Sequence, residues 1–518
     1  MKACPESLNF AAHVIAINAC RTDKTAYDDG VRQLSYGQLA QRIRQFSSVL
    51  NTLGIHREER VLLFMHDTVD WPVTFLGALS AGAVPVAVNT LLTAEDYAYI
   101  IEDSRCQLAV ISAPLLGVLR EAMAMAKHEI KWILISEPDH ALDGELLDFE
   151  KQIEQAPESP AIDTKADEIA FWLYSSGSTG RPKGVVHTHG NLWHTAELYG
   201  KPILGVREDD TVFSAAKLFF AYGLGNGLTF PLSVGATTIL MRDRPTPDSV
   251  FERLKKYQPT IYCGIPTLYA SMLASRHLPS RDDVALRICA SAGEALPKDL
   301  GDRFTRHFGC PILDGIGSTE MLHIFLSNQV DDLRYGTTGK PVPGYEVELR
   351  DDAGKPVPQN VIGDLYIKGP SAALMYWNNR HKTTDVFQGQ WLKSGDKYTR
   401  DADGYYIYAG RSDDMIKVSG QYVSPVEVES ILTQHPSVLE AAVIGAPDEE
   451  GLIKTIAYVV PQPGTIPDEQ MASELKTFVK SRLAPFKYPR TIHFVDELPK
   501  TATGKIQRFR LRQYCEAA

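Results

Sequence analysis

Short runs rich in β-branched residues alternate with longer amphipathic stretches along most of the chain. Runs such as Arg60–Phe64 have the length and composition of buried strands, whereas Tyr36–Leu53 and Asp248–Tyr257 repeat apolar residues at helical spacing. Strands that alternate with helices form parallel sheets covered by helices. The alternation therefore predicts an α/β fold, with further strands at Val84–Val88, Gln107–Ile111, Trp132–Ile135, Ile169–Leu173, Thr237–Met241, Thr260–Cys263, Arg287–Ser291 and Ile312–Asp314.

The pattern changes in the C-terminal part of the chain. From about residue 342 to residue 408, short strands are separated by turns rich in Gly, Asp and Pro, which indicates a smaller β-rich subdomain. Helix and strand patterns restart after residues 411–414 and suffice for a small α+β domain. We therefore expect a large N-terminal domain over residues 1–410, which includes the β-rich subdomain, then a hinge at 411–414 and a C-terminal domain over 415–518.

The chain of 518 residues is acidic, with 53 Lys and Arg against 64 Asp and Glu and a formal net charge of −11. Nucleic acids and anionic membranes bind to basic surfaces, so we expect neither as a partner. The most apolar stretch, Phe75–Val88, is too short to span a membrane, and the first residues lack the apolar core of a signal peptide. The seven cysteines form no C-x-x-C pair, which favours reduced thiols and a cytoplasmic protein.

Residues 174–184 have the sequence Tyr-Ser-Ser-Gly-Ser-Thr-Gly-Arg-Pro-Lys-Gly and directly follow a predicted strand. Glycines let backbone N–H groups approach an anion, hydroxyls add donors, and Lys183 supplies a point charge suited to phosphate. The Walker spacing is absent. A flexible Ser/Gly linker is the alternative, but linkers rarely stand between a buried strand and a helical run, here Thr188–Tyr199. The stretch predicts a phosphate-binding loop formed by Lys183 with Ser175, Ser176, Gly177, Ser178, Thr179 and Gly180.

Five further stretches follow this loop, at Ser291–Ala295, Gly317–Glu320, Ser394–Asp396, Gly410–Asp414 and Pro499–Lys505. Together with the loop, in this order and at these intervals, they resemble the signature of the adenylate-forming acyl-CoA synthetase superfamily. The resemblance extends over essentially the whole chain. It implies an enzyme that uses ATP and CoA as co-substrates and Mg²⁺ as cofactor, with the C-terminal domain as a mobile lid.

Four residues are the expected catalytic groups. A carboxylate that attacks the α-phosphate of ATP and expels pyrophosphate builds charge on phosphate oxygens, so the site must supply fixed cations, donors and a metal. The resemblance implies that Glu320 holds Mg²⁺ and that Thr319 contacts phosphate beside Lys183 of the loop. It also implies that Lys505 neutralises the encounter between the carboxylate and the α-phosphate. Taken alone, Glu320 and Lys505 would be interpreted as solvated side chains.

Two further groups of residues are expected to bind the nucleoside. The resemblance implies that Asp396 accepts hydrogen bonds from the ribose hydroxyls and that Arg411 assists it. A turn residue is the alternative interpretation of Asp396, since Ser-Gly-Asp is ordinary turn chemistry. Asp314 is expected at the adenine amino group, and the remaining nucleotide-binding residues are Gly293, Glu294, Ala295, Gly315, Ile316, Gly317 and Ser318.

The resemblance also implies a domain motion between two half-reactions. Lys505 belongs to the small domain and the phosphate loop to the large one, so adenylate formation requires both together. Transfer to CoA requires Lys505 to leave and a channel for the thiol to open. Asp413 is expected at the pivot, because hinges are a few residues that absorb the backbone change. Rotation would bring to the CoA channel Lys417, Ser419, Gly420, Gln421 and Tyr422.

Two aromatic stretches, Lys217–Gly223 and Met321–Phe325, are candidates for the acid-binding pocket. Apart from Lys217 at the start of the first, these stretches offer aromatic walls and one histidine, which suit a flat apolar ring. Core packing is the alternative, since aromatic runs more often fill cores than contact ligands. Both stretches line the acyl pocket in the superfamily, and we expect ring contacts from Ala221, Tyr222, Gly315, His323 and Ile324.

The amino-acid sequences of these stretches resemble those of bacterial benzoate–CoA ligases. Phe220 stands where many members of the superfamily carry His, and Ile316 where they carry Tyr or Phe, as in the benzoate type. The resemblance implies conversion of benzoate, ATP and CoA to benzoyl-CoA, AMP and pyrophosphate through benzoyl-adenylate, as in the degradation of aromatic compounds. A hydroxy-, amino- or heteroaryl acid stays open as the substrate, as does the loading of a carrier protein. A nucleotide-binding regulator without catalysis is a third hypothesis.

Three histidines that follow the loop, His187, His189 and His194, invite a metal-site hypothesis. A zinc site would need further Cys or acidic ligands at suitable spacing, and none is present in this stretch. We therefore interpret the three as packing and helix-start residues. The expected partners are small molecules, and the sequence leaves a monomer and a homodimer open.

Overall fold

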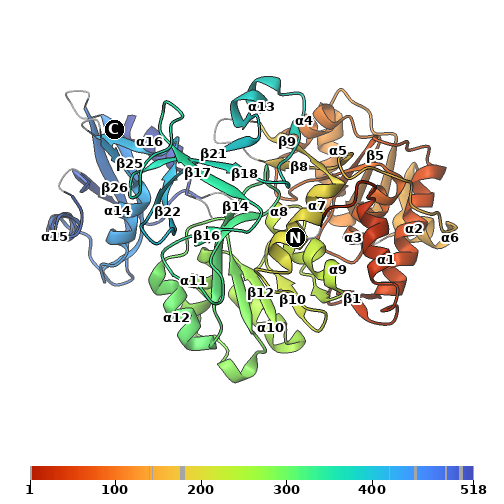
Figure 1. Cartoon of the computed structure of the whole chain (residues 1–518), viewed down its shortest axis with the longest axis horizontal. Helices are drawn as coiled ribbons and strands as arrows, with labels where there is room; N and C mark the ends of the chain where they lie inside the picture. The colour runs from red at the N-terminus through yellow and green to blue at the C-terminus, as the bar shows by residue number, and fades with distance from the viewer. Residues whose placement is uncertain are drawn as a thin grey trace. The chain divides into compact units, whose positions relative to one another are not determined.

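The computed structural model describes residues 3–138, 140–142, 144–175, 181–418, 421–447, 452–484, 487–500 and 506–516 (Figure 1). Contacts divide the chain into two compact units. Unit 1 comprises residues 1–335, 341–346 and 368–392, and unit 2 comprises residues 336–340, 347–367 and 393–518. The stretch 411–414, predicted as a hinge, lies inside unit 2.

Unit 1 contains the two large sheets that the alternating pattern predicts. Within the first sheet, β8, β4, β3, β5, β6 and β7 are parallel, and β9 is antiparallel to β8. The strand order of this sheet is β19 (Met375–Tyr376), β9 (Lys183–Thr188), β8 (Ile169–Ser175), β4 (Val84–Ala87), β3 (Arg60–Phe64), β5 (Leu108–Ser112), β6 (Trp132–Ser136) and β7 (Leu146–Asp148).

In the second sheet, β1, β11, β10, β12, β13 and β14 are parallel, and β2 and β15 are antiparallel to their neighbours. Its strand order is β16 (Lys340–Pro341), β15 (Ile324–Ser327), β14 (Ile312–Gly317), β13 (Ile288–Ser291), β12 (Ile261–Gly264), β10 (Thr211–Ser214), β11 (Thr237–Ile239), β1 (Thr25–Asp28) and β2 (Gln33–Ser35). Every strand predicted from the sequence is present, which confirms the α/β fold.

The helices of unit 1 connect these strands. α2 (Tyr36–Thr52) begins with a capping box, in which Ser35 accepts from the backbone N–H of Gln38 and the Gln38 side chain accepts from that of Ser35. The other helices are α1 (Phe10–Ile17), α3 (Asp70–Ala81), α4 (Ala94–Ser104), α5 (Leu116–Met125), α6 (Phe149–Gln155), α7 (His189–Thr195), α8 (Ala221–Leu224), α9 (Phe230–Val234), α10 (Pro247–Tyr257), α11 (Pro266–Ala274), α12 (Lys298–Phe308) and α13 (Arg380–Val386).

Unit 2 combines a β-rich part with a C-terminal α+β part. The β-rich part contains β17 (Glu346–Arg350), β18 (Gly363–Lys368), most of β21 (Trp391–Arg400), and β22 (Tyr406–Arg411), which pairs with β21. β20 (Phe387–Gln388) belongs to unit 1 and pairs with Trp391 and Leu392, the two β21 residues that also belong to unit 1. The C-terminal part contains the hairpin β23 (Ile416–Val418) and β24 (Gln421–Val423), the sheet β25 (Val438–Pro447), β26 (Ile453–Pro461) and β27 (Thr491–Phe494), and the helices α14 (Pro425–Leu432), α15 (Glu469–Lys480) and α16 (Arg508–Glu516).

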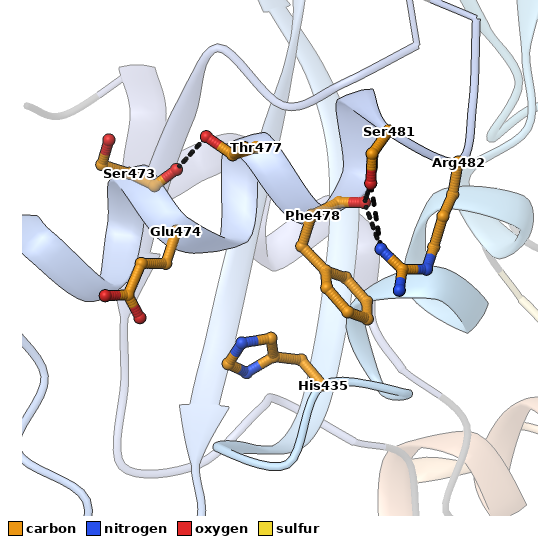
Figure 2. A pocket seen from close by; sticks show the side chains of 7 residues that line it. All are labelled: His435, Ser473, Glu474, Thr477, Phe478, Ser481 and Arg482. Carbon is orange, nitrogen blue, oxygen red and sulfur yellow. Dashed lines mark hydrogen bonds between the residues drawn. The ribbon is translucent and has the colours of Figure 1, made fainter.

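A surface hollow lies beside α15 in unit 2 (Figure 2). The His435 ring stands perpendicular to that of Phe478, with 5.0 Å between centroids. The Arg482 guanidinium lies over the ring of Phe478. It donates to the carbonyl of Phe478 at 3.1 Å and to Ser481 Oγ at 3.0 Å. None of the predicted site residues lines this hollow, so it is separate from the site described below.

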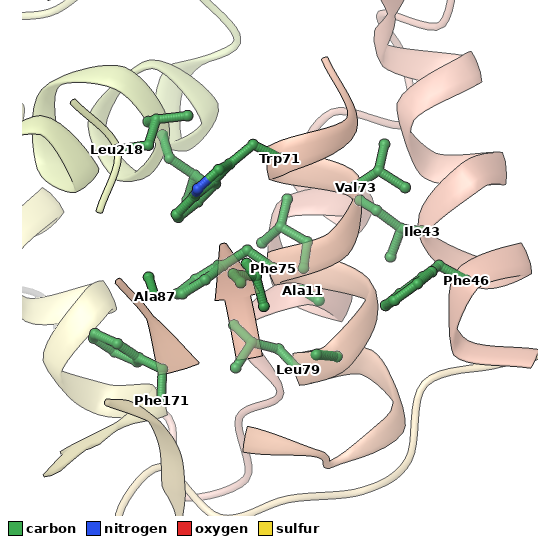
Figure 3. Packing of buried hydrophobic residues seen from close by; sticks show 14 of the residues in the cluster. Ala11, Ile43, Phe46, Trp71, Val73, Phe75, Leu79, Ala87, Phe171 and Leu218 are labelled. Carbon is green, nitrogen blue, oxygen red and sulfur yellow. The ribbon is translucent and has the colours of Figure 1, made fainter. Parts of the chain in front are cut away.

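The core of unit 1 is built around α3, every residue of which is buried (Figure 3). Its Trp71 and Phe75 rings stack at 5.1 Å, and Phe75 meets Phe171 of β8 edge-on at 5.4 Å. Gly77 lets α3 approach α2, because a Cβ there would lie 2.7 Å from Cδ1 of Phe46. Leu218, which precedes α8, belongs to the same cluster. The core therefore supports the start of one predicted acyl-pocket stretch.

No helix in the described part of the chain has the length and apolar composition needed to cross a membrane.

Candidate functional site

The strands that flank the predicted phosphate loop pair directly with each other. β8 ends at Ser175, which stands opposite Lys183 in the antiparallel ladder of β8 and β9. Ser176, Gly177, Ser178, Thr179 and Gly180 lie outside the described residues. The ladder therefore holds Ser175 and Lys183 at the two ends of the loop, as a strand–loop–strand hairpin requires.

Tyr376 lies between Lys183 and Glu320. The Lys183 Nζ is 5.1 Å from the centroid of the Tyr376 ring, and the Tyr376 hydroxyl donates to Glu320 Oε1 at 2.8 Å. Pairing of β19 with β9 sets Tyr376 opposite Val185, and so fixes this arrangement. Sequence reasoning missed Tyr376, because a single tyrosine in an apolar segment carries no motif.

Residues 318–322 form a turn that joins β14 to β15. The backbone N–H of Leu322 donates to the carbonyl of Thr319 at 3.1 Å, and that of Met321 donates to Ser318 Oγ at 3.2 Å. Leu322 has φ of +64°, in the left-handed region, which costs roughly 1–2 kcal/mol for a residue with a side chain. Neighbouring elements must therefore hold this turn, which contains Thr319 and Glu320.

Two of the three histidines after the loop, His187 and His189, are buried parts of the scaffold, and His194 is half-buried. His189 Nδ1 accepts from the backbone N–H of Phe10 at 3.2 Å, and His187 Nε2 lies 2.8 Å from the carbonyl of Thr319. Burial lowers the pKa of both His187 and His189 to about 4. Within the described ranges, no group of three or more His, Cys, Asp or Glu could hold a metal ion. The contact of His187 with Thr319 was not predicted from the sequence.

The predicted adenine-binding residues lie at the carboxyl end of β13 and in the neighbouring part of β14. These strands are parallel, and Ser291 stands opposite Asp314. Burial raises the pKa of Asp314 to about 8, and its side chain is only 4% exposed. Among the described residues, Asp314 Oδ1 has no hydrogen-bond partner. A neutral buried acid with an unpaired oxygen can accept a hydrogen bond from a ligand.

The other predicted nucleotide-binding residues follow β13 or lie in and just after β14. Gly293 has φ of +91°, which only glycine adopts without strain. The Glu294 carboxylate accepts from the Thr267 hydroxyl at 2.7 Å, and Ala295 is exposed. Gly315, Ile316 and Gly317 pair with β15, and Ser318 begins the turn.

The five predicted acyl-pocket residues come from α8, β14, the residue before β15 and the first residue of β15, all in unit 1. His323 Nε2 lies 3.3 Å from the carbonyl of Tyr222, and the two rings are 5.7 Å apart. A Cβ on Gly315 would lie 2.8 Å from Cγ2 of Ile324. Ala221 begins α8 beside Tyr222. The structure therefore brings together segments about a hundred residues apart in the sequence.

His323 has an aromatic and neutral environment. Its ring meets Phe230 edge-on at 4.5 Å and lies 5.2 Å from Tyr199. Burial lowers the pKa of His323 to about 3, so the ring is neutral at physiological pH. Over the described chain, His323 Nδ1 and the hydroxyl of Tyr222 are buried without a hydrogen-bond partner.

Asp396 and Arg411 pair within unit 2. They stand opposite each other on β21 and β22, and Arg411 Nη1 donates to Asp396 Oδ1 at 3.0 Å. The next residues form a turn in which the backbone N–H of Asp414 donates to the carbonyl of Arg411 at 3.0 Å. Asp413, predicted as the pivot, lies in this turn. Ser412 Oγ donates to Asp364 Oδ1 at 2.9 Å, which ties the turn to β18.

The predicted CoA-channel residues begin at the hairpin of β23 and β24. Lys417 and Tyr422 are paired across it, and Gln421 stands opposite Val418. Ser419 and Gly420 lie outside the described residues, as does the predicted catalytic Lys505.

Comparisons with known proteins cover nearly the full length of the chain. The model of the AMP-binding enzyme family matches residues 16–377, and that of the AMP-binding enzyme C-terminal domain matches residues 427–505. A protein from Thauera aromatica named benzoate–CoA ligase is 54% identical over 98% of this chain and 96% of its own length.

Two solved structures are also similar over nearly the whole chain. A benzoate CoA ligase from Burkholderia xenovorans LB400 is 59% identical, with a TM-score of 0.91 over 98% of this chain and 100% of its own. The anthranilate CoA ligase AuaEII, solved with anthranoyl-AMP, is 40% identical, with a TM-score of 0.93 over 100% of this chain and 99% of its own.

Proposed function

Because the chain belongs to the AMP-binding enzyme family, we propose that it is an AMP-forming aryl acid–CoA ligase whose substrate is benzoate. In the first half-reaction, a benzoate oxygen attacks the α-phosphorus of ATP, which forms benzoyl-adenylate and releases pyrophosphate. In the second, the CoA thiolate attacks the acyl carbon, which forms benzoyl-CoA and releases AMP. The similar proteins from Thauera aromatica and Burkholderia xenovorans are both named benzoate–CoA ligases, which supports this substrate.

The turn after β14 is the observation that carries this proposal. Its first residues, Thr319 and Glu320, lie near Lys183 through Tyr376. His323, which follows it, lies among neutral aromatic side chains. A flat uncharged ring in the aromatic environment would present its carboxylate toward the phosphate side of the turn.

We assign the nucleotide to the ends of β13 and β14. The unpaired oxygen of Asp314 would accept from the adenine amino group, and the backbone around Gly293 and Gly315 would follow the plane of the base. The phosphates would meet Lys183, Thr319 and the loop after Ser175, whose donors suit anionic oxygens. Asp396 would accept from the ribose hydroxyls, with Arg411 holding its carboxylate in place.

Glu320 fits the requirements of a Mg²⁺ ligand. Mg²⁺ prefers oxygen ligands, keeps several waters, and is commonly bound by one or two carboxylates together with substrate phosphates. Glu320 supplies such a carboxylate, oriented by the hydroxyl of Tyr376, with the Thr319 hydroxyl as a neighbouring oxygen donor. When bound, the ion would neutralise charge on the phosphate oxygens.

We further propose that the two half-reactions use two arrangements of the C-terminal domain. Lys505 would meet the carboxylate and the α-phosphate during adenylate formation. A rotation about Asp413 would then replace Lys505 by the hairpin that carries Lys417 and Tyr422, along which the CoA thiol would enter. A Lys505→Ala variant should lose adenylate formation and still convert supplied benzoyl-adenylate and CoA to thioester.

A screen for pyrophosphate release tests the function itself. The acids are benzoate, its hydroxy, amino and fluoro derivatives, heteroaryl and alicyclic acids, and a series of aliphatic acids. We expect benzoate to give the highest kcat/KM. Comparison of free CoA with a phosphopantetheinylated carrier protein identifies the acceptor. Faster reaction with aliphatic acids would contradict the assignment of the aromatic pocket.

A hydroxybenzoate is a second candidate substrate. The buried hydroxyl of Tyr222 and His323 Nδ1 lack partners among the described residues, and both belong to residues that we assign to the acid-binding pocket. A ring hydroxyl could satisfy one of them. A buried polar group left without a partner costs about 1–3 kcal/mol, so a substrate that supplies the partner would be favoured by about that amount. Comparison of the three hydroxybenzoates with benzoate decides between these substrates.

We place the reaction in the cytoplasm, where ATP and CoA are available, and expect a monomer or a homodimer. Light scattering after size-exclusion chromatography measures the oligomeric state.

A further inference from the structure

A connected set of hydrogen bonds lies directly behind the turn at 318–322. His187 of β9 is fully buried, and its Nε2 lies 2.8 Å from the carbonyl of Thr319. Its Nδ1 lies 2.9 Å from Nδ2 of Asn191, in α7. The His187 ring also stacks on Phe171 at 5.1 Å with an interplanar angle of 15°. The ring is therefore held both in its plane and at both nitrogens.

The neighbours of Asn191 fix the direction of each hydrogen bond. Asn191 Nδ2 also lies 3.2 Å from the carbonyl of Ala372, which can only accept, so Nδ2 is the amide nitrogen and donates. Asn191 Oδ1 accepts from the Thr188 hydroxyl at 3.0 Å. Nδ1 of His187 therefore accepts, and the ring proton resides on Nε2 and is donated to Thr319.

The same turn is held on its other side by the segment 371–376. The backbone N–H of Ala373 donates to the carbonyl of Glu320 at 2.7 Å, and Ser371 Oγ donates to that of Met321 at 2.8 Å. Asn191 contacts both sides, because its amide donates to His187 and to Ala372. His187 and Asn191 thus link the strand that carries Lys183 to the turn that carries Glu320.

We propose that His187, oriented by Asn191, is a positioning residue for Thr319 and Glu320 in adenylate formation. This inference rests on the proposed function, in which these two residues meet the phosphates of ATP and Mg²⁺. Because Leu322 has a strained backbone conformation, the turn should relax to a less strained one when a restraint is removed. The carbonyl of Thr319 keeps the N–H of Leu322 as a partner without His187, so removal of the ring displaces the turn and does not unfold it.

A pair of variants separates the donor from the bulk of the ring. The amide nitrogen of a His187→Gln side chain reaches the position of Nε2 and can donate to Thr319, whereas His187→Leu fills the space without a donor. We expect His187→Leu to slow benzoate-dependent pyrophosphate exchange by about 10-fold to 100-fold, since misplacement by about 1 Å costs 10²-fold. His187→Gln should stay within about 3-fold of the parent enzyme, because a donor of the same reach restores most of the bond.

Three further measurements distinguish positioning from a structural role. Calorimetric titration with Mg²⁺ and a non-hydrolysable ATP analogue should show weaker binding to His187→Leu than to His187→Gln. Conversion of supplied benzoyl-adenylate and CoA to thioester should change by less than about 3-fold in both variants, since that step does not transfer a phosphoryl group. In the unmodified enzyme, ¹⁵N-labelled histidine should show His187 as the neutral Nε2–H tautomer.

Several outcomes would contradict the positioning role of His187, and a different one would contradict the proposed function. If His187→Leu binds and exchanges as the parent enzyme does, or if Gln and Leu lose activity equally, the positioning role is wrong. Equal loss of the thioester step would also contradict it, as would an Nδ1–H tautomer. If the unmodified enzyme forms no benzoyl-adenylate, the proposed function fails, and the binding titration and the tautomer still test His187.

Discussion

Replacement of Asp314 by Asn should change how the stability of unit 1 depends on pH. Asp314 is 4% exposed, and burial raises its pKa from an ordinary value of 3.8 to about 8. At pH 5–7 the folded protein therefore holds a proton on this carboxyl, whereas the unfolded chain does not. Because the folded state binds more protons, stability falls as pH rises between these two pKa values. Asn has the same shape and does not ionise.

The folded and unfolded states differ by one bound proton, so the free energy of unfolding changes by about 1.4 kcal/mol per pH unit. Over two pH units, from 5 to 7, the parent protein should lose about 2.7 kcal/mol relative to Asp314→Asn. The entropy of unfolding scales with size, at about 2.1 cal/mol/K per residue. For a unit of about 360 residues, this corresponds to a relative shift in Tm of about 3–4 °C.

Differential scanning of both proteins without ligand at pH 5 and pH 7 measures this shift. The Tm of Asp314→Asn minus that of the parent should rise by about 3–4 °C between the two pH values. The exposed Asp282→Asn is the matched control and should give a constant difference. A constant difference for Asp314→Asn as well, or one that falls with pH, would show that the Asp314 carboxyl is ionised in the folded protein.

Three further substitutions test the contacts around the turn and the nucleotide. Tyr376→Phe removes the 2.8 Å bond to Glu320 and keeps the ring beside Lys183, so the Mg²⁺ concentration that gives half-maximal adenylation should rise by about 10-fold. Gly225→Ala places a methyl group against the imidazole of His323 and should lower kcat/KM for benzoate by at least about 10-fold, while the KM for ATP stays constant in steady-state assays. Arg411→Met removes the 3.0 Å pair with Asp396 and should raise the KM for ATP by about 3-fold to 10-fold, because the pair is partly exposed.

Local sequence patterns predicted the strands well because each strand has its own signal. Ile169–Leu173 is a continuous apolar run, and β8 covers Ile169–Ser175. The helix predicted at Tyr36–Leu53 is α2, which ends at Thr52. β14 continues past the predicted Ile312–Asp314 to Gly317, because its antiparallel pairing with β15 extends it. That extension depends on a partner strand, which no local pattern contains.

The contacts that were not predicted are those between distant segments. His187 and Thr319 are 132 residues apart, and Tyr376 and Glu320 are 56 residues apart. Each of these four residues fits its own segment without reference to its partner. The local sequence therefore contains no signal for either hydrogen bond. The motifs predict a set of site residues, and the fold determines which distant residues contact them.

The turn at 318–322 connects the two halves of the proposed site through a very short segment. Glu320 and His323 are three residues apart, and the strained Leu322 lies between them. Because a left-handed leucine has few alternative conformations, displacement at Glu320 must be transmitted to His323 unless both ends are held. His187 and Ala373 hold the first end, and Tyr222 and Phe230 contact the ring at the second.

Coupling between the two ends follows from this geometry. His187→Leu releases the end at Thr319, and Gly225→Ala displaces the ring at His323. If the turn moves as one body, the double variant should lose less adenylation activity than the product of the two single losses, with a coupling of at least about 0.5 kcal/mol. Additive losses would mean that the two ends are held independently. In that case the phosphate side of the site would be unaffected by changes in the acid-binding pocket.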